Sequence, residues 1–250
     1  QFIVGDEISD IGSTRVVAHR GFHSSSVSEN SIASLKAAQQ LGIYGSEFDV
    51  WITTDGVPVV NHNPSIPGDD HVIQNSTYSQ IQDVKLSNGE YVPTLAQYLM
   101  QGQEDKDMRL VLEIKSHDSS AKNAACVEAC VNMVKGLNLE NQVDWIAFSL
   151  DNCKMVKKLL PSAKVQYLSG NLTPSSLHSD GIDGIDYSAS VLNSHPEWID
   201  LARGLGMIVN VWTVDDVASM LKFAALGVDF ITTNKPDVLK DLLTRTYVTE

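Results

Sequence analysis

Short apolar runs alternate with amphipathic helical stretches along most of the chain. Runs typical of buried strands begin at Val16, Ser46, Arg109, Val143, Val165, Gly184, Met207 and Val228, and each is followed by helical sequence. The expected helices cover about 32–41, 94–100, 119–137, 151–160, 197–205 and 215–226, with shorter ones near 78–84 and after Pro174 and Pro236. Eight such repeats in a chain of this length predict an α/β fold, a (β/α)8 TIM barrel.

A doubly wound open sheet is the structural alternative. It is less favoured because polar residues end several different strands of this chain. An open sheet instead gathers its site at one switch point in the strand order.

The pattern changes between residues 46 and 62, where two strand-like runs flank Asp55-Gly56. Such a pair between alternating apolar residues is typical of a tight hairpin turn. If the turn has two residues, the pairing places Asp49 opposite His62, on the same face of the hairpin. The second run must then be antiparallel, so we expect an extra β-hairpin arm after the second barrel strand.

The length of 250 residues suits a single barrel domain over residues 1–250. Residues 63–93 are mostly polar and loop-like, and they predict a short rim insertion rather than a separate domain. Residues 1–14 carry an apolar patch at 2–4 and are expected to form a packed or frayed lead-in.

Charge and hydropathy exclude several classes of partner. The net charge of −13 argues against nucleic acid as a principal partner. Apolar runs stay below the ~18 residues that a membrane span needs, so we expect no stable membrane insertion. Cys126, Cys130 and Cys153 lack a CxxC pattern and are expected to be buried free thiols. The first residue, Gln1, leaves the compartment open, with an exported protein that has lost its signal slightly favoured over a cytoplasmic one. The oligomeric state is not indicated.

Polar residues gather where the predicted strands end, which in a barrel is the face that carries the active site. They are His19, Arg20, Glu47, Asp49, Glu113, Lys115 and Trp212, joined by His62 from the hairpin arm. Three carboxylates without cysteine ligands suit a hard divalent cation, Mg²⁺ or Ca²⁺, while the two histidines keep Zn²⁺ possible.

Each of these residues alone has an ordinary structural explanation, such as a surface ion pair or a histidine bonded to backbone. Their common position at strand ends weakens that explanation. Arg20 and Lys115 supply the local positive charge that a phosphate needs in an acidic protein. A divalent ion, two cations and two histidines describe phosphoryl transfer by positioning, charge neutralisation and proton shuttling.

The chain resembles the glycerophosphodiester phosphodiesterases in a series of motifs that spans nearly its whole length. They are Ala18-His19-Arg20-Gly21, Glu29-Asn30-Ser31, Glu47-Phe48-Asp49-Val50, the Asp55-Gly56 turn, Val59-Val60-Asn61-His62, Glu113-Ile114-Lys115, Val211-Trp212-Thr213 and Thr232-Thr233-Asn234-Lys235-Pro236. The resemblance implies a barrel enzyme that hydrolyses glycerophosphodiesters, such as glycerophosphocholine, to sn-glycerol 3-phosphate and an alcohol.

The resemblance also implies a role for each candidate. His19 and His62 would be the acid and base, and Glu47, Asp49 and Glu113 would bind the divalent metal. Arg20 and Lys115 would contact the phosphate, and Trp212 would line the substrate pocket. The attack on phosphorus, by water or by the glycerol hydroxyl through a cyclic intermediate, is left open.

The chain departs from the family pattern at Asn63 and Asn234, where relatives often have Asp, and we expect this to tune the site. One alternative is a phospholipase of the same barrel superfamily, which the polar rim at 63–93 disfavours. Another is a binding protein that holds a phosphoglycerol ligand without turnover. The sequence mark of such a protein would be a lost histidine or carboxylate, and all are present.

Overall fold

The computed structural model describes residues 13–245, and the apolar lead-in expected at residues 2–4 lies outside this range. Eight parallel strands close into a barrel: β1 (Arg15–Ala18), β2 (Gly45–Ile52), β4 (Arg109–Ile114), β5 (Val143–Ala147), β6 (Lys164–Tyr167), β7 (Gly184–Ser188), β8 (Ile208–Trp212) and β9 (Phe230–Thr233). Pairing of β1 with both β2 and β9 closes the ring. The predicted TIM barrel is confirmed, and the open-sheet alternative is wrong because the sheet has no free edge at β1.

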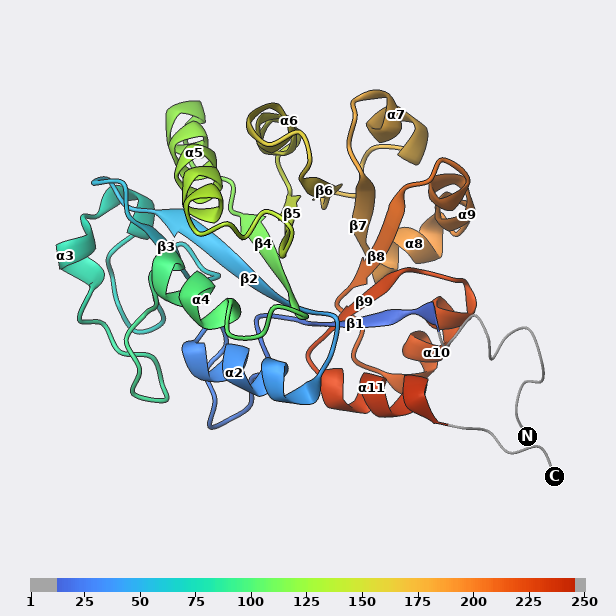
Figure 1. Cartoon of the computed structure of the whole chain (residues 1–250), viewed down its shortest axis with the longest axis horizontal. Helices are drawn as coiled ribbons and strands as arrows, with labels where there is room; N and C mark the ends of the chain where they lie inside the picture. Colours follow the sequence, from blue (N-terminus) through green and yellow to red (C-terminus); the bar gives the residue numbers. More distant parts are fainter. Residues whose placement is uncertain (1–12, 246–250) are drawn as a thin grey trace.

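Helices surround the strands in Figure 1. They are α2 (Ile32–Leu41), α4 (Leu95–Gly102), α5 (Ser120–Gly136), α6 (Leu150–Leu159), α7 (Pro174–Ser179), α8 (Ala189–Ser194), α9 (Glu197–Gly204), α10 (Val217–Ala225) and α11 (Pro236–Thr244). Most match the sequence prediction within two residues. The short α8 and a 3-10 turn, η1 (Ile73–Asn75), were not predicted, because such brief elements carry too few periodic positions to recognise.

Side chains alternate between the two faces of each strand, and the two faces differ in character. Those facing the helices form the main apolar core. Those facing the barrel axis form a smaller apolar cluster that includes Val17, Val111, Ile146 and Leu168. His19 and Glu113 come two residues after Val17 and Val111, so their side chains point to the same interior of the barrel, above this cluster.

The predicted register of the hairpin is wrong by one residue. In the structure Val50 pairs with Val60 and Ile52 with Pro58, in the antiparallel strand β3 (Pro58–Val60), so Asn61 and not His62 lies opposite Asp49. The turn has three residues, because Gly56 alone takes a positive φ, of 83°. A two-residue turn of the common type needs positive φ at both central positions, which Asp55 does not adopt.

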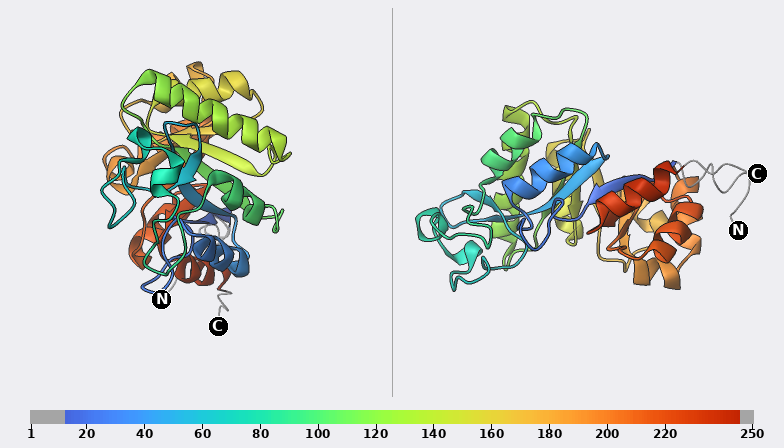
Figure 2. Two further views of the ribbon diagram at one scale, coloured as in Figure 1. Left: turned by 90° about the vertical axis from the view of Figure 1, so that its left-hand side faces the viewer. Right: turned by 90° about the horizontal axis from the view of Figure 1, so that it is seen from below.

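The segment between β3 and α4 forms a rim at one side of the barrel, and Figure 2 shows that it projects beyond the ring of helices. It contains η1 and α3 (Tyr78–Ile81). Its apolar residues Ile66, Ile73, Ile81 and Val92 pack with Trp51 and Val59 of the hairpin in a separate cluster. The rim therefore has more apolar mass than its polar sequence predicts.

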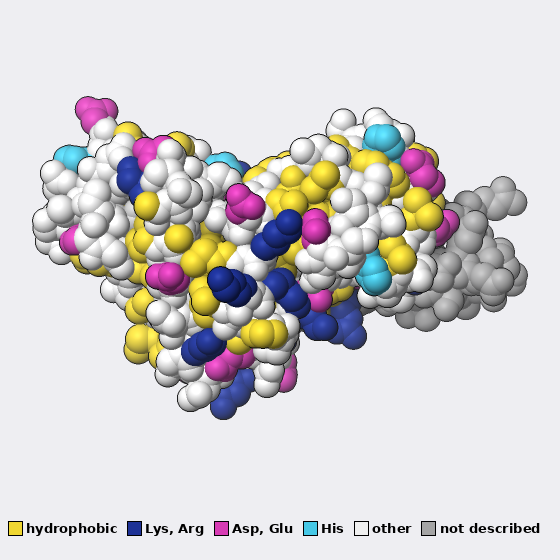
Figure 3. Space-filling model, turned by 90° about the horizontal axis from the view of Figure 1, so that it is seen from above, with side chains coloured by type: hydrophobic (Ala, Val, Ile, Leu, Met, Phe, Trp, Pro, Cys, Tyr) yellow, Lys and Arg dark blue, Asp and Glu magenta, His cyan; other side chains and the backbone are white. Residues whose placement is uncertain are grey.

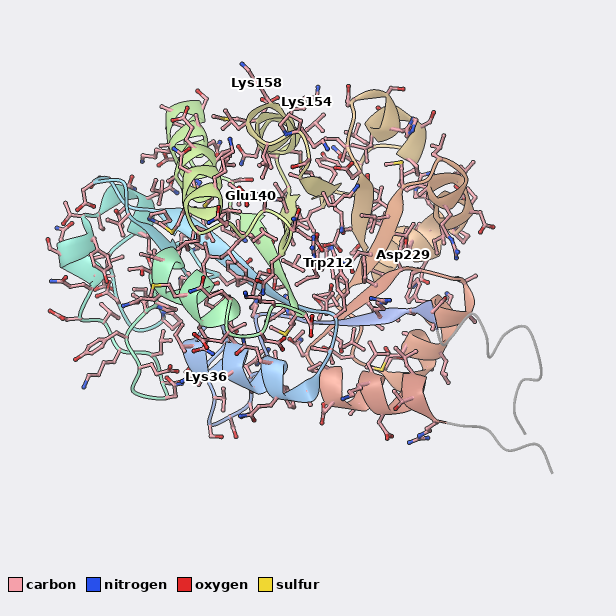
Figure 4. All side chains as sticks on the ribbon, in the orientation of Figure 1. Lys36, Glu140, Lys154, Lys158, Trp212 and Asp229 are labelled. Carbon is pink, nitrogen blue, oxygen red and sulfur yellow. The ribbon has the colours of Figure 1, made fainter. Side chains whose placement is uncertain are left out.

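The outer surface carries a basic group that is separate from the strand ends. Lys and Arg side chains gather near the middle of the face seen from above in Figure 3. Helix α6 supplies three lysines, of which Lys154 and Lys157 pair with Asp180 and Asp183. Lys154 and Lys158 point away from the barrel in Figure 4, whereas Trp212 lies inside the ring of strands.

Among residues 13–245 we find no helix of the length and apolarity that a membrane crossing requires. Cys126, Cys130 and Cys153 are buried free thiols, as predicted.

Candidate active site

Three carboxylates converge at the carboxyl ends of β2 and β4. Glu47 and Asp49 lie two residues apart on β2 and so share a face, and Asp49 pairs directly with Glu113. Ligand atoms of the three side chains lie within 4.8 Å of one another, and all three residues are buried. Oxygen ligands of this kind suit a divalent cation.

The electrostatics of the cluster favour a bound cation. Burial, with the added repulsion of Asp49 and Glu113, raises the pKa of Glu47 well above its usual range. Burial and the charge of Asp49 likewise raise the pKa of Glu113 to about 8. Burial acts in the same sense on Asp49, but contact with His62 and the charge of Lys115 outweigh it and hold its pKa below the usual range. A divalent cation would let all three stay ionised, so these residues fit a metal site.

The turn after β1 brings Arg20 to this cluster. Arg20 and Gly21 both take positive φ, of 57° and 77°. A Cβ on Gly21 would lie 2.8 Å from the backbone of Ser34 and closer still to its side chain, so glycine is required at this position. The turn directs the backbone N–H of Arg20 to Glu47 Oε2 at 3.0 Å.

The Arg20 guanidinium links the carboxylates to the hairpin arm. Its Nη1 donates to Glu29 at 2.9 Å, and its Nη2 lies 3.0 Å from His62 Nε2. Arginine cannot accept, so His62 Nε2 is the acceptor and the proton of the neutral ring resides on Nδ1. Nδ1 faces Asp49 Oδ2 at 3.3 Å, although the angle is poor for a hydrogen bond.

His62 lies beside Asp49 for a reason that the sequence did not predict. The ladder between β2 and β3 ends at Val60, so His62 is not constrained to the alternation of the strand. Its carbonyl accepts a 3.1 Å hydrogen bond from Trp51 Nε1, which holds the chain after the strand against β2. The predicted neighbourhood of His62 and Asp49 is therefore present, despite the wrong register.

His19 follows β1 and is held by Asn234, which follows β9, the strand that pairs with β1 to close the barrel. Its Nδ1 lies 2.8 Å from Asn234 Oδ1, which also receives His23 Nε2 at 2.9 Å. Asn234 Nδ2 donates to Asp215 at 3.0 Å, which fixes the orientation of the amide. His19 therefore carries its proton on Nδ1 and leaves Nε2 free, at 4.0 Å from Glu47. Burial and the charge of Arg20 lower the pKa of His19.

Seven of the eight predicted side chains line one cavity of about 90 Å³ at the strand ends: His19, Arg20, Glu47, Asp49, His62, Glu113 and Trp212. The eighth, Lys115, lies beside them with its Nζ 2.9 Å from Glu113 Oε2. Apolar walls come from Ile146, Phe148 and Leu168, and Phe148 meets Trp212 edge to face.

Several residues of the site were missed by sequence reasoning. Asn30 donates to Asp49 Oδ2 at 3.0 Å, and Asp186 lines the cavity with one buried oxygen that has no hydrogen-bond partner among the described residues. Burial raises the pKa of Asp186 to about 8. Asp186 sits on β7 at a position that faces the barrel axis, and this inward position was the available signal.

Comparison with known proteins agrees with this geometry. A family model described as "Glycerophosphoryl diester phosphodiesterase family" matches residues 19–238, which include every candidate residue. A glycerophosphodiester phosphodiesterase of Caldanaerobacter subterraneus subsp. tengcongensis is 30% identical over 242 residues, covering 92% of this chain and 98% of that protein.

Solved structures extend the likeness. A glycerophosphodiester phosphodiesterase from Parabacteroides distasonis has a TM-score of 0.89 and 44% identity, covering 92% of this chain and 97% of its own. An Oleispira antarctica phosphodiesterase, solved in complex with the product sn-glycerol-3-phosphate, has the same fold at 22% identity, with a TM-score of 0.80 over 92% of this chain and 97% of its own.

The barrel and these matches define an enzyme, a phosphoric diester hydrolase. The family model covers most of the chain, and a relative at 30% identity aligns along nearly all of it. The chain therefore belongs to the glycerophosphoryl diester phosphodiesterase family.

Proposed function

We propose that this enzyme hydrolyses small, deacylated glycerophosphodiesters to sn-glycerol 3-phosphate and an alcohol, with His19 and His62 as base and acid beside a divalent metal. The observation that carries the proposal is the convergence of two histidines, a guanidinium and three buried carboxylates on one cavity. The product bound to the Oleispira antarctica phosphodiesterase supports the substrate class. We further propose that residues 1–250 are one barrel domain with 63–93 as its rim.

Glu47, Asp49 and Glu113 would hold the cation, which is Mg²⁺ or Ca²⁺ on the preference of these ions for oxygen ligands. When bound, the cation would offset negative charge on the phosphate oxygens. Arg20 and Lys115 would contribute the remaining positive charge around the phosphate. Trp212 would form a wall of the substrate pocket, opposite the charged side.

The tautomer of His19 indicates its role in proton transfer. His19 presents an unprotonated Nε2 to the cavity, so it is placed to take the proton of the attacking hydroxyl, from water or from the glycerol itself. The new bond forms from that oxygen to phosphorus as the bond to the leaving alcohol breaks. Contact of the phosphate with Nη2 of Arg20 would free His62 Nε2 to take up a proton from water, while Nη1 stays paired with Glu29. The resulting imidazolium, facing Asp49 through Nδ1, would then give the Nε2 proton to the leaving alkoxide.

The hydrogen bond from His19 to Asn234 gives a test of this positioning. We expect Asn234→Ala to lower kcat about tenfold with little change in KM, because the ring loses the acceptor that fixes its tautomer. Asn234→Asp can still accept the bond from His19 but turns its second oxygen toward Asp215, so it should keep more activity than Asn234→Ala and less than the wild type. ¹⁵N shifts of the imidazole would report the tautomer directly, and Asn141→Ala, at an exposed residue, is the control. Equal kcat in the alanine variant and the wild type would refute the role.

The proposed reaction is tested by incubating the purified protein with glycerophosphodiesters and measuring sn-glycerol 3-phosphate, with Mg²⁺, with Ca²⁺ and with excess chelator. We expect turnover that needs a divalent ion. Activity in excess chelator would remove the metal from the proposal. Tight binding without product would point to a binding protein, and turnover of intact lipids alone would point to a phospholipase.

A further inference from the structure

A second cavity adjoins the one that holds the carboxylates. It measures about 460 Å³, against about 90 Å³ for the first, and the two share Arg20 and His62 as walls. Its other walls come from the loop after β1 and from the turn of the rim that contains Lys85 and Ser87.

The rim turn is fixed against the loop after β1. Ser28 Oγ lies 2.8 Å from Ser87 Oγ and accepts a 3.1 Å hydrogen bond from the backbone N–H of Asn88. Glu29, in the same loop, is bound to Arg20. These contacts join segments about 60 residues apart in the sequence and form both walls of the cavity in the absence of a ligand.

Because Arg20 and His62 line both cavities, each cavity can receive one of the two alcohol arms of a phosphodiester. His19, Trp212 and the apolar side chains line the first cavity, while the second has neither His19 nor Trp212 among its walls. On the proposed function, the phosphate sits at Arg20. The glycerol arm, which all the substrates share, fits the smaller cavity. The leaving alcohol then extends past His62, its proton donor, into the larger cavity.

The chemistry of the second cavity favours one class of alcohol. Hydroxyl and amide groups of Ser24, Ser28, Ser87 and Asn63 line it, and no Phe, Tyr or Trp does. Glu29 is already neutralised by Arg20. Lys85 lines the cavity, and its Nζ lies 5.7 Å from the centre of the Tyr91 ring. It makes no ion pair within residues 13–245, so no carboxylate neutralises its charge at the edge of the cavity. A quaternary ammonium is best held by aromatic faces and repelled by lysine, whereas a polyhydroxylated alcohol can bond to the polar walls.

We propose that this second cavity is the subsite for the leaving alcohol and that it selects polyhydroxylated head groups, such as glycerol or inositol, over choline. The inference rests on the proposed phosphodiesterase function and adds its head-group preference.

The test compares kcat/KM for glycerophosphoinositol, glycerophosphoglycerol, glycerophosphocholine and the methyl ester of sn-glycerol 3-phosphate. We expect the wild type to prefer the two polyol substrates over the choline substrate. Lys85→Glu should shift the polyol-to-choline ratio toward choline by about 5- to 10-fold, since it replaces repulsion of the ammonium by attraction. The methyl ester, which is too small to enter the cavity, should change less than about twofold.

Lys36→Glu is the matched control, because Lys36 is exposed on α2 and is not among the walls of the cavity. It changes the net charge equally and should leave the ratio unaltered. An unaltered ratio in Lys85→Glu, or a wild-type preference for choline, would overturn the subsite while leaving the phosphodiesterase in place. Failure to hydrolyse any of the four diesters would instead overturn the proposed function. Both lysines are exposed, so neither substitution threatens the fold.

Discussion

Replacing His19 by alanine is expected to lower kcat for glycerophosphodiester hydrolysis by about 10²- to 10⁴-fold, and His62→Ala should do the same. On the proposed mechanism the two rings act in one proton-transfer sequence, so the double variant should lose little more than either single variant. His71→Ala is the matched control, because His71 lies on the rim, is exposed, and hydrogen-bonds and pairs only with Asp69 among the described residues.

The same variants separate acid from base when the leaving group is changed. A glycerophosphodiester of p-nitrophenol releases a stable phenolate that needs no proton, so activity lost in His62→Ala should be largely restored. His19→Ala should stay impaired, because the attacking oxygen still needs a base. Rescue of His19→Ala and not of His62→Ala would reverse the two assignments, and rescue of neither would remove the leaving-group role from both.

The second large effect concerns the metal and stability. We expect Mg²⁺ or Ca²⁺ at about 100 times its Kd to add about 2.7 kcal/mol to the free energy of unfolding, which corresponds to about 5–10 °C in Tm. Above about pH 8, where Glu113 is ionised, the three buried carboxylates repel one another without a cation, so Glu113→Gln should raise the Tm of the metal-free protein there. The same substitution removes a ligand and should abolish most of the metal-induced increase.

The pH dependence follows from the raised pKa of Glu113. Folding takes up a proton between the ordinary value of 4.5 and about 8, so the metal-free protein should lose stability as pH rises through this interval. The Tm gained on adding metal should accordingly be larger at pH 8 than at pH 6. Thermal unfolding with chelator or metal at both pH values measures this, and Glu104→Gln, at an exposed residue, is the control. At pH 8 and above, a metal-free Glu113→Gln protein that melts below the wild type would contradict the repulsion argument.

The barrel could be predicted because its strands and helices each carry a complete local signal. Polar residues that follow buried strands, such as Glu113 after Leu112, then locate the site, since all parallel strands end at one face. The turn at Asp55-Gly56 shows the limit of such local reasoning. The same two residues serve a two- or a three-residue turn, and only the sign of φ at Asp55 decides the register.

Contacts between residues near the first and last strands of the barrel could not be predicted, for a different reason. His19 and Asn234 are 215 residues apart, and they meet because β1 and β9 close the ring. Sequence places both near strand ends but cannot say which side chains pair. Asp186 was overlooked because a single acidic residue in a strand is usually exposed to solvent. Only the structure shows that this position of β7 faces the barrel interior.

One edge of β2 is shared between two partners, and this arrangement divides the enzyme into separable parts. The first residues of that edge pair with β1, and its last residues pair with the antiparallel β3. The carboxylates and His19 are thereby anchored in the barrel, while His62 and Lys85 belong to an insertion with its own apolar cluster. On the proposed function, changes confined to that insertion can therefore alter which alcohol is released without disturbing the residues proposed to bind the metal. Leaving-group specificity is, on this architecture, a modular property.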